Sequence, residues 1–145
     1  MYRSDVVGSL LRPEYLKEAR TKFEAGALTD AAFKEIEDRA VNDAVAMQIR
    51  AGLDVITDGE LRRYAFWGHL CDAVDGFDKW GGWGITFRDE SGAELAQKRP
   101  VVVSKLRRKR PLCAEEFTYL RALTRNAARP VTPKVTFVSA QQVSA

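Results

Sequence analysis

The sequence predicts an α/β domain in which short parallel strands alternate with helices. Two short apolar runs, at residues 6–9 and 53–57, flank a region with helical periodicity. A helical connection of that length between two strands indicates a parallel pair with a right-handed crossover. The chain has 145 residues, 46% of them hydrophobic, which is enough for one domain, residues 1–145. Because an eight-stranded α/β barrel needs about 250 residues, the sequence predicts a small open α/β domain or roughly the first half of a barrel.

The first strand is predicted at residues 6–9, where Gly8 interrupts an apolar run and a tight turn follows. Pro13 then fits the first position of a helix, where a missing N–H has no consequence. Apolar residues recur at helical spacing as far as Phe23, and Gly26 is typical of a helix C-terminus.

The clearest predicted element is a second helix that begins near Thr29 or Asp30, both favourable N-caps, and ends at Gly52. Its apolar stripe consists of Phe33, Ile36, Ala40, Ala44, Met47 and Ala51. The second strand follows directly at residues 53–57, which are too few for a helix and rich in β-branched residues.

The second half of the chain is predicted to return to the main sheet twice. Glycines punctuate a hairpin excursion at about residues 76–99, after the second strand. Residues 101–105 are then predicted as a buried strand, residues 115–125 as a helix, and residues 134–139 as a further strand.

Composition narrows the class of protein. No apolar run approaches the roughly 20 residues of a membrane span, and no signal pattern precedes the first strand, so we expect a cytoplasmic protein without a membrane partner. Cys71 and Cys113 lack the spacing of a disulfide framework or a zinc knuckle. Both are interpreted as free, packed or incidental thiols, and His69, the only histidine, as a packed or surface residue.

The net charge of +3 owes most to one basic run at residues 105–110. Such a run can bind phosphates, and nucleic acid is one hypothesis. No aromatic residues interleave with it for base stacking, and acidic and basic residues are mixed elsewhere. A solvated loop is therefore the favoured interpretation.

Candidate functional residues follow the two predicted strands. Asp58 and Glu60 come directly after the second strand, at the edge of a parallel sheet where ligands bind. Paired carboxylates can hold a metal ion, exchange protons or bind an amino group; ion pairing with Arg62 and Arg63 is the structural alternative. After the first strand, Ser9 and the preceding glycine could offer N–H and hydroxyl donors to a carboxylate.

The two segments at residues 7–13 and 52–63 together resemble the cobalamin-independent methionine synthase family. The similarity is greatest to its short, single-barrel members, described as methyltetrahydropteroyltriglutamate–homocysteine methyltransferase-like. Residues 83–87, 103–106 and 134–136 also fit that pattern. The resemblance implies a partial TIM (β/α)8-type barrel, roughly its first half, with the hairpin excursion after strand 2.

The family resemblance also implies a function. Members transfer a methyl group from 5-methyltetrahydrofolate to the thiol of homocysteine, which a zinc ion binds. By motif match, Gly8 and Ser9 would contact the substrate carboxylate and Glu60 its ammonium group. Arg12 would be a second partner of the carboxylate, and the role of Asp58 is left open.

The zinc ligands of the family come from later barrel strands, and Cys71, Cys113 and His69 do not match their positions. The sequence therefore predicts a truncated, inactive part of such an enzyme, with no catalytic and no metal-binding residue of its own. The alternatives are alkyl transfer to a different thiol and a non-catalytic half-barrel that self-associates or binds a complementing half. Whether this chain alone is an enzyme is left open.

Overall fold

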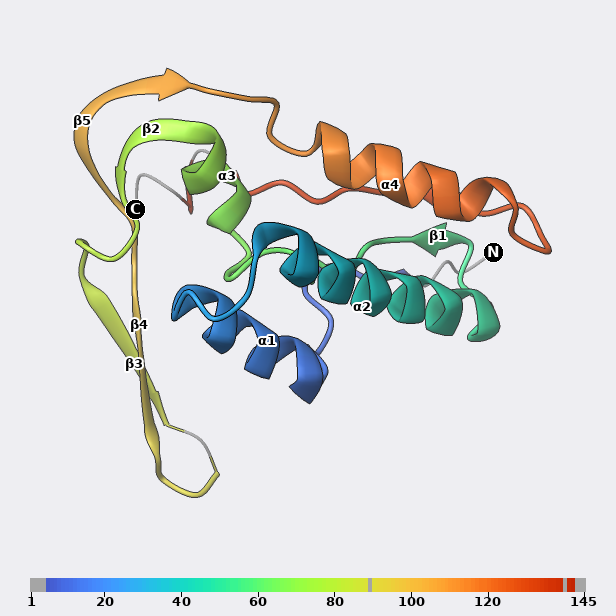
Figure 1. Ribbon diagram of the computed structural model, residues 1–145, viewed down its shortest axis with the longest axis horizontal. Coiled ribbons are helices and arrows are strands. Elements are labelled where there is room, and N and C mark those ends of the chain that lie inside the picture. Colours follow the sequence, from blue (N-terminus) through green and yellow to red (C-terminus); the bar gives the residue numbers. More distant parts are fainter. Residues whose placement is uncertain (1–4, 89, 140, 143–145) are drawn as a thin grey trace. The chain divides into compact units, whose positions relative to one another are not determined.

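The computed structural model describes residues 5–88, 90–139 and 141–142. Its elements in chain order, drawn in Figure 1, are α1 (Glu14–Glu24), α2 (Asp30–Arg50), β1 (Val55–Ile56), α3 (Gly68–Ala73), β2 (Val74–Asp78), β3 (Gly84–Arg88), β4 (Glu94–Lys98), β5 (Val101–Arg108), α4 (Ala114–Arg125) and β6 (Thr132–Pro133). The predicted α/β class is confirmed, whereas the partial barrel and the single domain stay predictions. None of the described helices is both long and apolar enough to cross a membrane.

The chain forms two compact units. The first unit combines Met1–Phe66 with Cys113–Phe137, and the second combines Trp67–Leu112 with Val138–Ala145. The first unit contains α1, α2, α4, β1 and β6; the second contains α3 and the strands β2 to β5.

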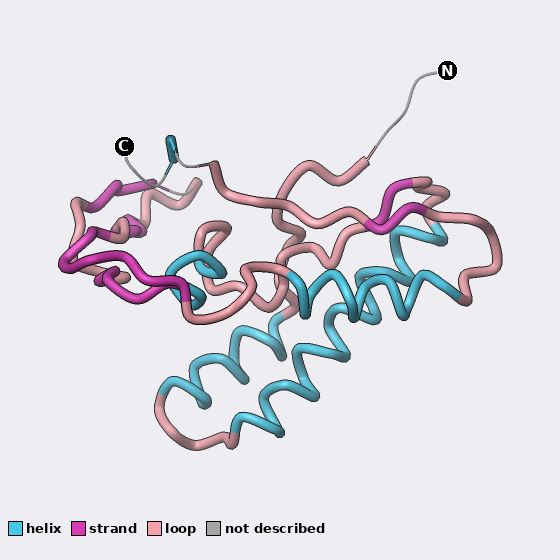
Figure 2. Tube along the Cα trace, turned by 90° about the horizontal axis from the view of Figure 1, so that it is seen from above, coloured by secondary structure: helices cyan, strands magenta, loops and turns pink. Residues whose placement is uncertain are grey.

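The first unit begins with the hairpin of helices α1 and α2, visible in Figure 2. The Thr29 hydroxyl accepts a hydrogen bond from the Ala32 amide at 3.2 Å, which caps α2 as predicted. Gly26 and Gly52, with φ of 73° and 82°, follow the ends of the two helices. The buried faces of α1, α2 and α4 form a common core with β1, whose members are Leu16, Ala19, Phe33, Ala40, Val41, Ala44, Val45, Ile56, Leu61 and Leu120.

Strand β1 pairs in parallel with β6, the segment that follows α4. The predicted second strand is thus present at its centre, Val55–Ile56. The strand predicted at residues 134–139 is wrong in position, because the pairing lies at Thr132–Pro133 and ends there. Two main-chain bonds of 2.8 Å, from Thr132 N to Asp54 O and from Lys134 N to Ile56 O, form this short ladder.

The end of β1 is fixed by a buried side chain of α2. Gln48 donates to the Thr57 carbonyl at 2.8 Å and accepts from the Thr57 amide at 3.0 Å. Both residues are 1% exposed. The Gln48 amide therefore takes the place of a neighbouring strand where the β1–β6 ladder has ended, and it satisfies main-chain groups that water does not reach.

The predicted first strand is wrong as an element, since residues 5–13 contain no strand in the structure. Its main chain makes one bond to the segment after β1, from Leu10 N to Gly59 O at 3.0 Å. A single bond is not a ladder, so the predicted parallel pair of residues 6–9 and 53–60 does not form. The segment nevertheless lies beside the turn that follows β1.

The second unit consists of two antiparallel ribbons and the short helix α3. The hairpin predicted within residues 76–99 is present as β3 and β4. The buried main-sheet strand predicted at residues 101–105 is wrong: β5 pairs antiparallel with β2, and its residues are exposed, Val103 by 63%. A β-branched run also suits a two-stranded ribbon, so its apolar character alone did not indicate burial.

Replacing Gln48 by leucine should lower the free energy of unfolding by about 3 kcal/mol, because the Thr57 amide and carbonyl lose their partners. Chemical denaturation measures this change. The matched control is Glu35→Leu at an exposed position of the same helix, where a change within about 0.5 kcal/mol is expected. Equal effects of both substitutions would show that the hydrogen bonds from Gln48 to the Thr57 main chain do not stabilise the fold.

Candidate functional site

The candidate site is built on a turn with two successive left-handed residues. Gly59 and Glu60 have φ of 68° and 56°, and Glu60 is the one non-glycine residue with positive φ in the described chain. The Thr57 hydroxyl accepts from the Gly59 amide at 3.1 Å, and Asp58 Oδ1 accepts from the Glu60 amide at 3.0 Å. Left-handed backbone at a residue with a side chain is unfavourable, and such residues cluster at functional sites.

Gly59 also allows the N-terminal segment to approach. A Cβ atom at Gly59 would lie 2.9 Å from Leu10 Cδ1 and 3.1 Å from Leu10 Cβ, closer than van der Waals contact. The Leu10–Gly59 main-chain bond holds the two segments together at this point. The turn therefore determines where the N-terminal segment lies.

The Glu60 carboxylate receives hydrogen bonds from two different segments. The Ser9 hydroxyl donates to Oε2, and the Thr136 hydroxyl donates to Oε1 at 2.5 Å. Glu60 is 4% exposed, whereas Ser9 is an exposed residue. The structure thus brings together the serine and the glutamate that the sequence predicted to share one rim, although their role in binding stays a prediction.

Arg63 connects this carboxylate to the first turn of α4 and to the segment that follows β6. Its side chain is 1% exposed and lies 3.4 Å from Glu60 Oε1. Arg63 forms a two-pronged pair with Glu116 at 2.7 and 3.4 Å, and it donates to the Thr136 carbonyl at 3.1 Å. A buried arginine is tolerated when such partners satisfy its donors.

Sequence reasoning missed Glu116 and Thr136 as members of this cluster. They lie 53 and 73 residues from Arg63 in the chain, and no local motif marks either of them. The structural alternative considered for the acidic pair holds in part, because Arg63 pairs with Glu60. Arg62 instead pairs with Asp38 of α2 at 2.5 Å.

Arg12 contacts the turn, whereas no side-chain contact is seen that requires glycine at position 8. Arg12 donates to the carbonyls of Arg63 at 2.6 Å and Glu60 at 3.4 Å. Its buried Nε has no hydrogen-bond partner in the described part of the chain. Nothing lies within 4 Å of a Cβ placed at Gly8, so no close packing requires glycine there.

Asp58 is 3% exposed and uses only one of its two oxygens, since Oδ2 has no hydrogen-bond partner among the described residues. Burial raises the pKa of the Asp58 carboxyl, and the nearby Glu116 raises it further. The hydrogen bond from the Glu60 amide and the charge of Arg63 oppose this rise without cancelling it. Asp58 is therefore more readily protonated in the folded chain than an exposed aspartate.

The described residues do not offer a suitable set of ligands for the zinc ion that the family resemblance implies. Within the described residues, no three His, Cys, Asp or Glu side chains are placed to hold a metal ion. Burial, together with Glu116, raises the pKa of the Cys113 thiol to about 11, whereas zinc binds the thiolate. Cys71 and Cys113 are both buried free thiols, as the sequence predicted.

Comparisons with known proteins place these observations in a family. The family described as "Cobalamin-independent synthase, Catalytic domain" matches residues 3–143. A methionine synthase of Saccharolobus solfataricus is 30% identical over 122 residues, which are 82% of this chain and 34% of that protein. The protein YxjH of Bacillus subtilis, described as uncharacterized, is 46% identical over 77 residues, 53% of this chain and 20% of its own.

One solved structure covers nearly the whole chain. It is described as a candidate vitamin-B12-independent methionine synthase of Listeria monocytogenes, with 25% identity and a TM-score of 0.68 over 99% of this chain and 38% of that one. The chain thus spans less than two fifths of the length of each of these three relatives.

Alanine at Gly59 should lower stability by at least about 1 kcal/mol more than alanine at Gly52. Both glycines have positive φ, but nothing lies within 4 Å of a Cβ at Gly52, while Leu10 blocks one at Gly59. Thermal or chemical denaturation of the two variants isolates the contact with Leu10. Equal losses would show that the N-terminal segment does not depend on this close approach.

The stability of Asp58→Asn relative to the wild type should rise with pH. Asparagine keeps the oxygen that accepts from the Glu60 amide but carries no charge. Because the folded-state pKa of Asp58 is raised, the wild type loses stability as pH increases from about 4, the unfolded value, through the folded value. Denaturation of both proteins from pH 3 to pH 8 measures this difference, and a constant difference would contradict it.

Proposed function

This chain belongs to the family of the cobalamin-independent synthase catalytic domain, and we propose that it provides part of the amino-acid site of a methyltransferase. The substrates proposed are homocysteine, whose thiol accepts the methyl group, and 5-methyltetrahydrofolate, which donates it. The observation that carries the proposal is the buried Glu60 carboxylate in contact with the exposed Ser9.

The chemistry of an amino acid suits these groups. Its ammonium group would bind the Glu60 carboxylate, whose oxygens can each accept more than one hydrogen bond. Its carboxylate would take donors from the N-terminal segment: the Ser9 hydroxyl, the main-chain N–H groups of Gly8 and Ser9, and Arg12, whose Nε is buried and uncommitted. Ser9 would exchange its bond to Glu60 for one to the substrate.

The second carboxylate, Asp58, is proposed to hold the turn. Its Oδ1 bond to the Glu60 amide supports the left-handed conformation that places the Glu60 side chain. Oδ2 is free to accept a further hydrogen bond from the substrate ammonium. We assign no catalytic residue to this chain.

In the family, zinc binds the thiol and favours its thiolate form. Because the described residues do not provide the ligands, we propose that methyl transfer needs residues beyond those of this chain. The acceptor could equally be another small thiol, because the contacts proposed here involve only the amino and carboxylate groups of the substrate.

Binding of L-homocysteine to the chain, followed by NMR titration, tests the amino-acid site. We expect Glu60→Gln to weaken binding by at least about tenfold, because a charge-assisted hydrogen bond is lost. The control Glu115→Gln, an exposed carboxylate of α4, should leave affinity unchanged. 4-Mercaptobutyrate lacks the amino group, so its binding should not respond to Glu60→Gln. Equal weakening of both ligands, or no homocysteine binding by the wild type, would overturn the proposal.

A methyl-transfer assay tests the claim that the chain alone is inactive. The isolated chain with zinc, homocysteine and 5-methyltetrahydrofolate should form no methionine, whereas fusion to the remaining barrel of a methionine synthase should restore turnover. Activity of the isolated chain would refute the claim.

A binding or assembly module is the second candidate, favoured by the exposed apolar side chains of β5, among them Val102, Val103 and Leu106. Long exposed strands of this kind favour association. Light scattering should then show an oligomer that Val103→Lys dissociates, and a stable monomer would exclude this function.

A further inference from the structure

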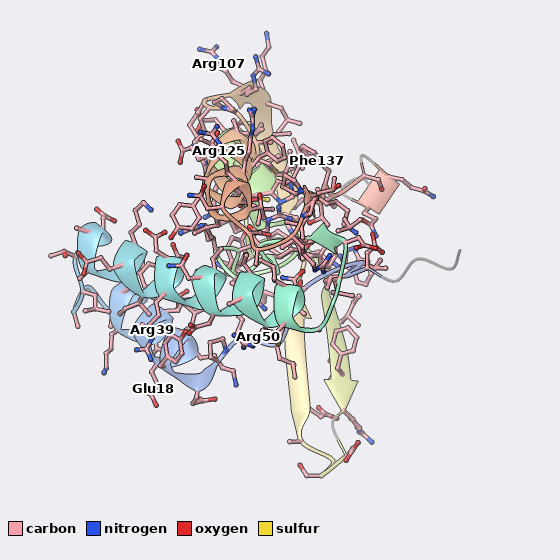
Figure 3. The ribbon with its side chains drawn as sticks, turned by 90° about the vertical axis from the view of Figure 1, so that its right-hand side faces the viewer. Glu18, Arg39, Arg50, Arg107, Arg125 and Phe137 are labelled. Carbon is pink, nitrogen blue, oxygen red and sulfur yellow. The ribbon has the colours of Figure 1, made fainter. Side chains whose placement is uncertain are left out.

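A pocket of about 460 Å³ lies in the first unit, at the C-terminal end of α4 and along the segment that leads into β6. Figure 3 labels Arg125, which stands in the last turn of this helix. The pocket is lined by Arg121, Thr124, Arg125, Ala127, Ala128, Arg129, Pro130, Val131 and Pro133. Three of these nine side chains are arginines, and none is acidic.

One of the arginines is held in place by the start of β1. Arg129 pairs with Asp54 at 2.9 Å and donates to the Leu53 carbonyl. Its guanidinium group is therefore fixed before any ligand arrives, and Asp54 compensates one positive charge. A fixed donor loses little freedom on binding, which favours affinity.

The other two arginines are uncommitted. Arg121 and Arg125 are four residues apart on α4 and thus share one face of the helix. Both are exposed, and within the described chain neither guanidinium group forms an ion pair or a hydrogen bond. Arginine near a helix C-terminus commonly binds the last carbonyl groups, but neither side chain does so here.

From these contacts we infer that the pocket binds a small oxyanion with two or more negative charges, such as a phosphorylated or polycarboxylate metabolite. Guanidinium groups match the oxygens of phosphate and carboxylate in two-pronged geometry. Two unneutralised arginines next to a fixed third call for a multiply charged ligand. The volume lies within the range of small-molecule sites.

This pocket is separate from the Glu60 site. Strands β1 and β6 are parallel; Asp54 and all pocket residues except Pro133, which belongs to β6, precede the strands, whereas Glu60 and Thr136 follow them. The two sites therefore lie at opposite edges of this small sheet, and the inference does not depend on the proposed function.

Isothermal titration of the chain with pyrophosphate and with citrate tests the pocket. We expect saturable binding of at least one anion to one site, weakened by at least about tenfold in the double variant Arg121→Gln/Arg125→Gln. Tighter binding of pyrophosphate would identify a phosphate ligand, and tighter binding of citrate a polycarboxylate. A wild-type thermal midpoint of the variant, whose substitutions are both exposed, confirms that it folds.

The matched control is Arg107→Gln/Arg108→Gln, which removes the same charge from exposed positions of β5. It should change affinity less than twofold, as should Glu60→Gln. Asp54→Asn should tighten binding, because the asparagine oxygen still accepts from Arg129 and keeps it in place, while the compensating negative charge is removed. Equal weakening in both double variants, or no saturable binding of either anion, would overturn the inference.

Discussion

The left-handed turn after β1 is the constraint on which the candidate site depends. Two successive residues with positive φ reverse the chain within a short distance and direct the Glu60 side chain toward the N-terminal segment. Only glycine at position 59 lets Leu10 approach, and that approach places Ser9 beside Glu60. Neither Ser9 nor Glu60 belongs to a helix or a strand. A change in this turn would therefore displace both the Ser9 hydroxyl and the Glu60 carboxylate that accepts from it.

Burial of so many charges is tolerated because they compensate one another. Arg63 carries the positive charge at the centre, between Glu60 and the tightly paired Glu116. Removing one partner from such a cluster leaves an uncompensated buried charge, which is more unfavourable than an exposed ion pair is favourable. Asp58 lies at the same cluster and forms no ion pair among the described residues; burial first, and then the nearby Glu116, raise the pKa of its carboxyl.

Local signals in the sequence predicted the helices and part of the site. Thr29, Gly26 and Gly52 marked helix ends because capping depends on neighbouring residues alone. The sequence could predict that Ser9 and Glu60 lie close together, because each stands at or after the C-terminal end of an apolar run and a helical connection joins the two runs. Glu116 and Thr136 could not, since their contacts with Arg63 depend on how α4 and β6 pack.

The strand errors have one physical origin. An apolar, β-branched run indicates extended chain, but it does not reveal how many neighbours the chain will pair with. Residues 6–9 form no ladder, and the one main-chain bond to the segment after β1 comes from Leu10, whereas β5 pairs antiparallel with β2 while its side chains stay in solvent. Pairing depends on residues far away in the sequence, and burial depends on what covers the sheet.

The shortness of the β1–β6 ladder is offset by cations at both ends of β6. Before the strand, Arg129 reaches the Leu53 carbonyl and Asp54; after it, Lys134 reaches the Val6 carbonyl and Asp5. Each side chain thus supplies to a neighbouring segment the main-chain contact that further residues of strand would have made. A two-residue strand can hold its register in this way, and with it the separation of the Glu60 cluster after the strands from the arginine-lined pocket at their other end.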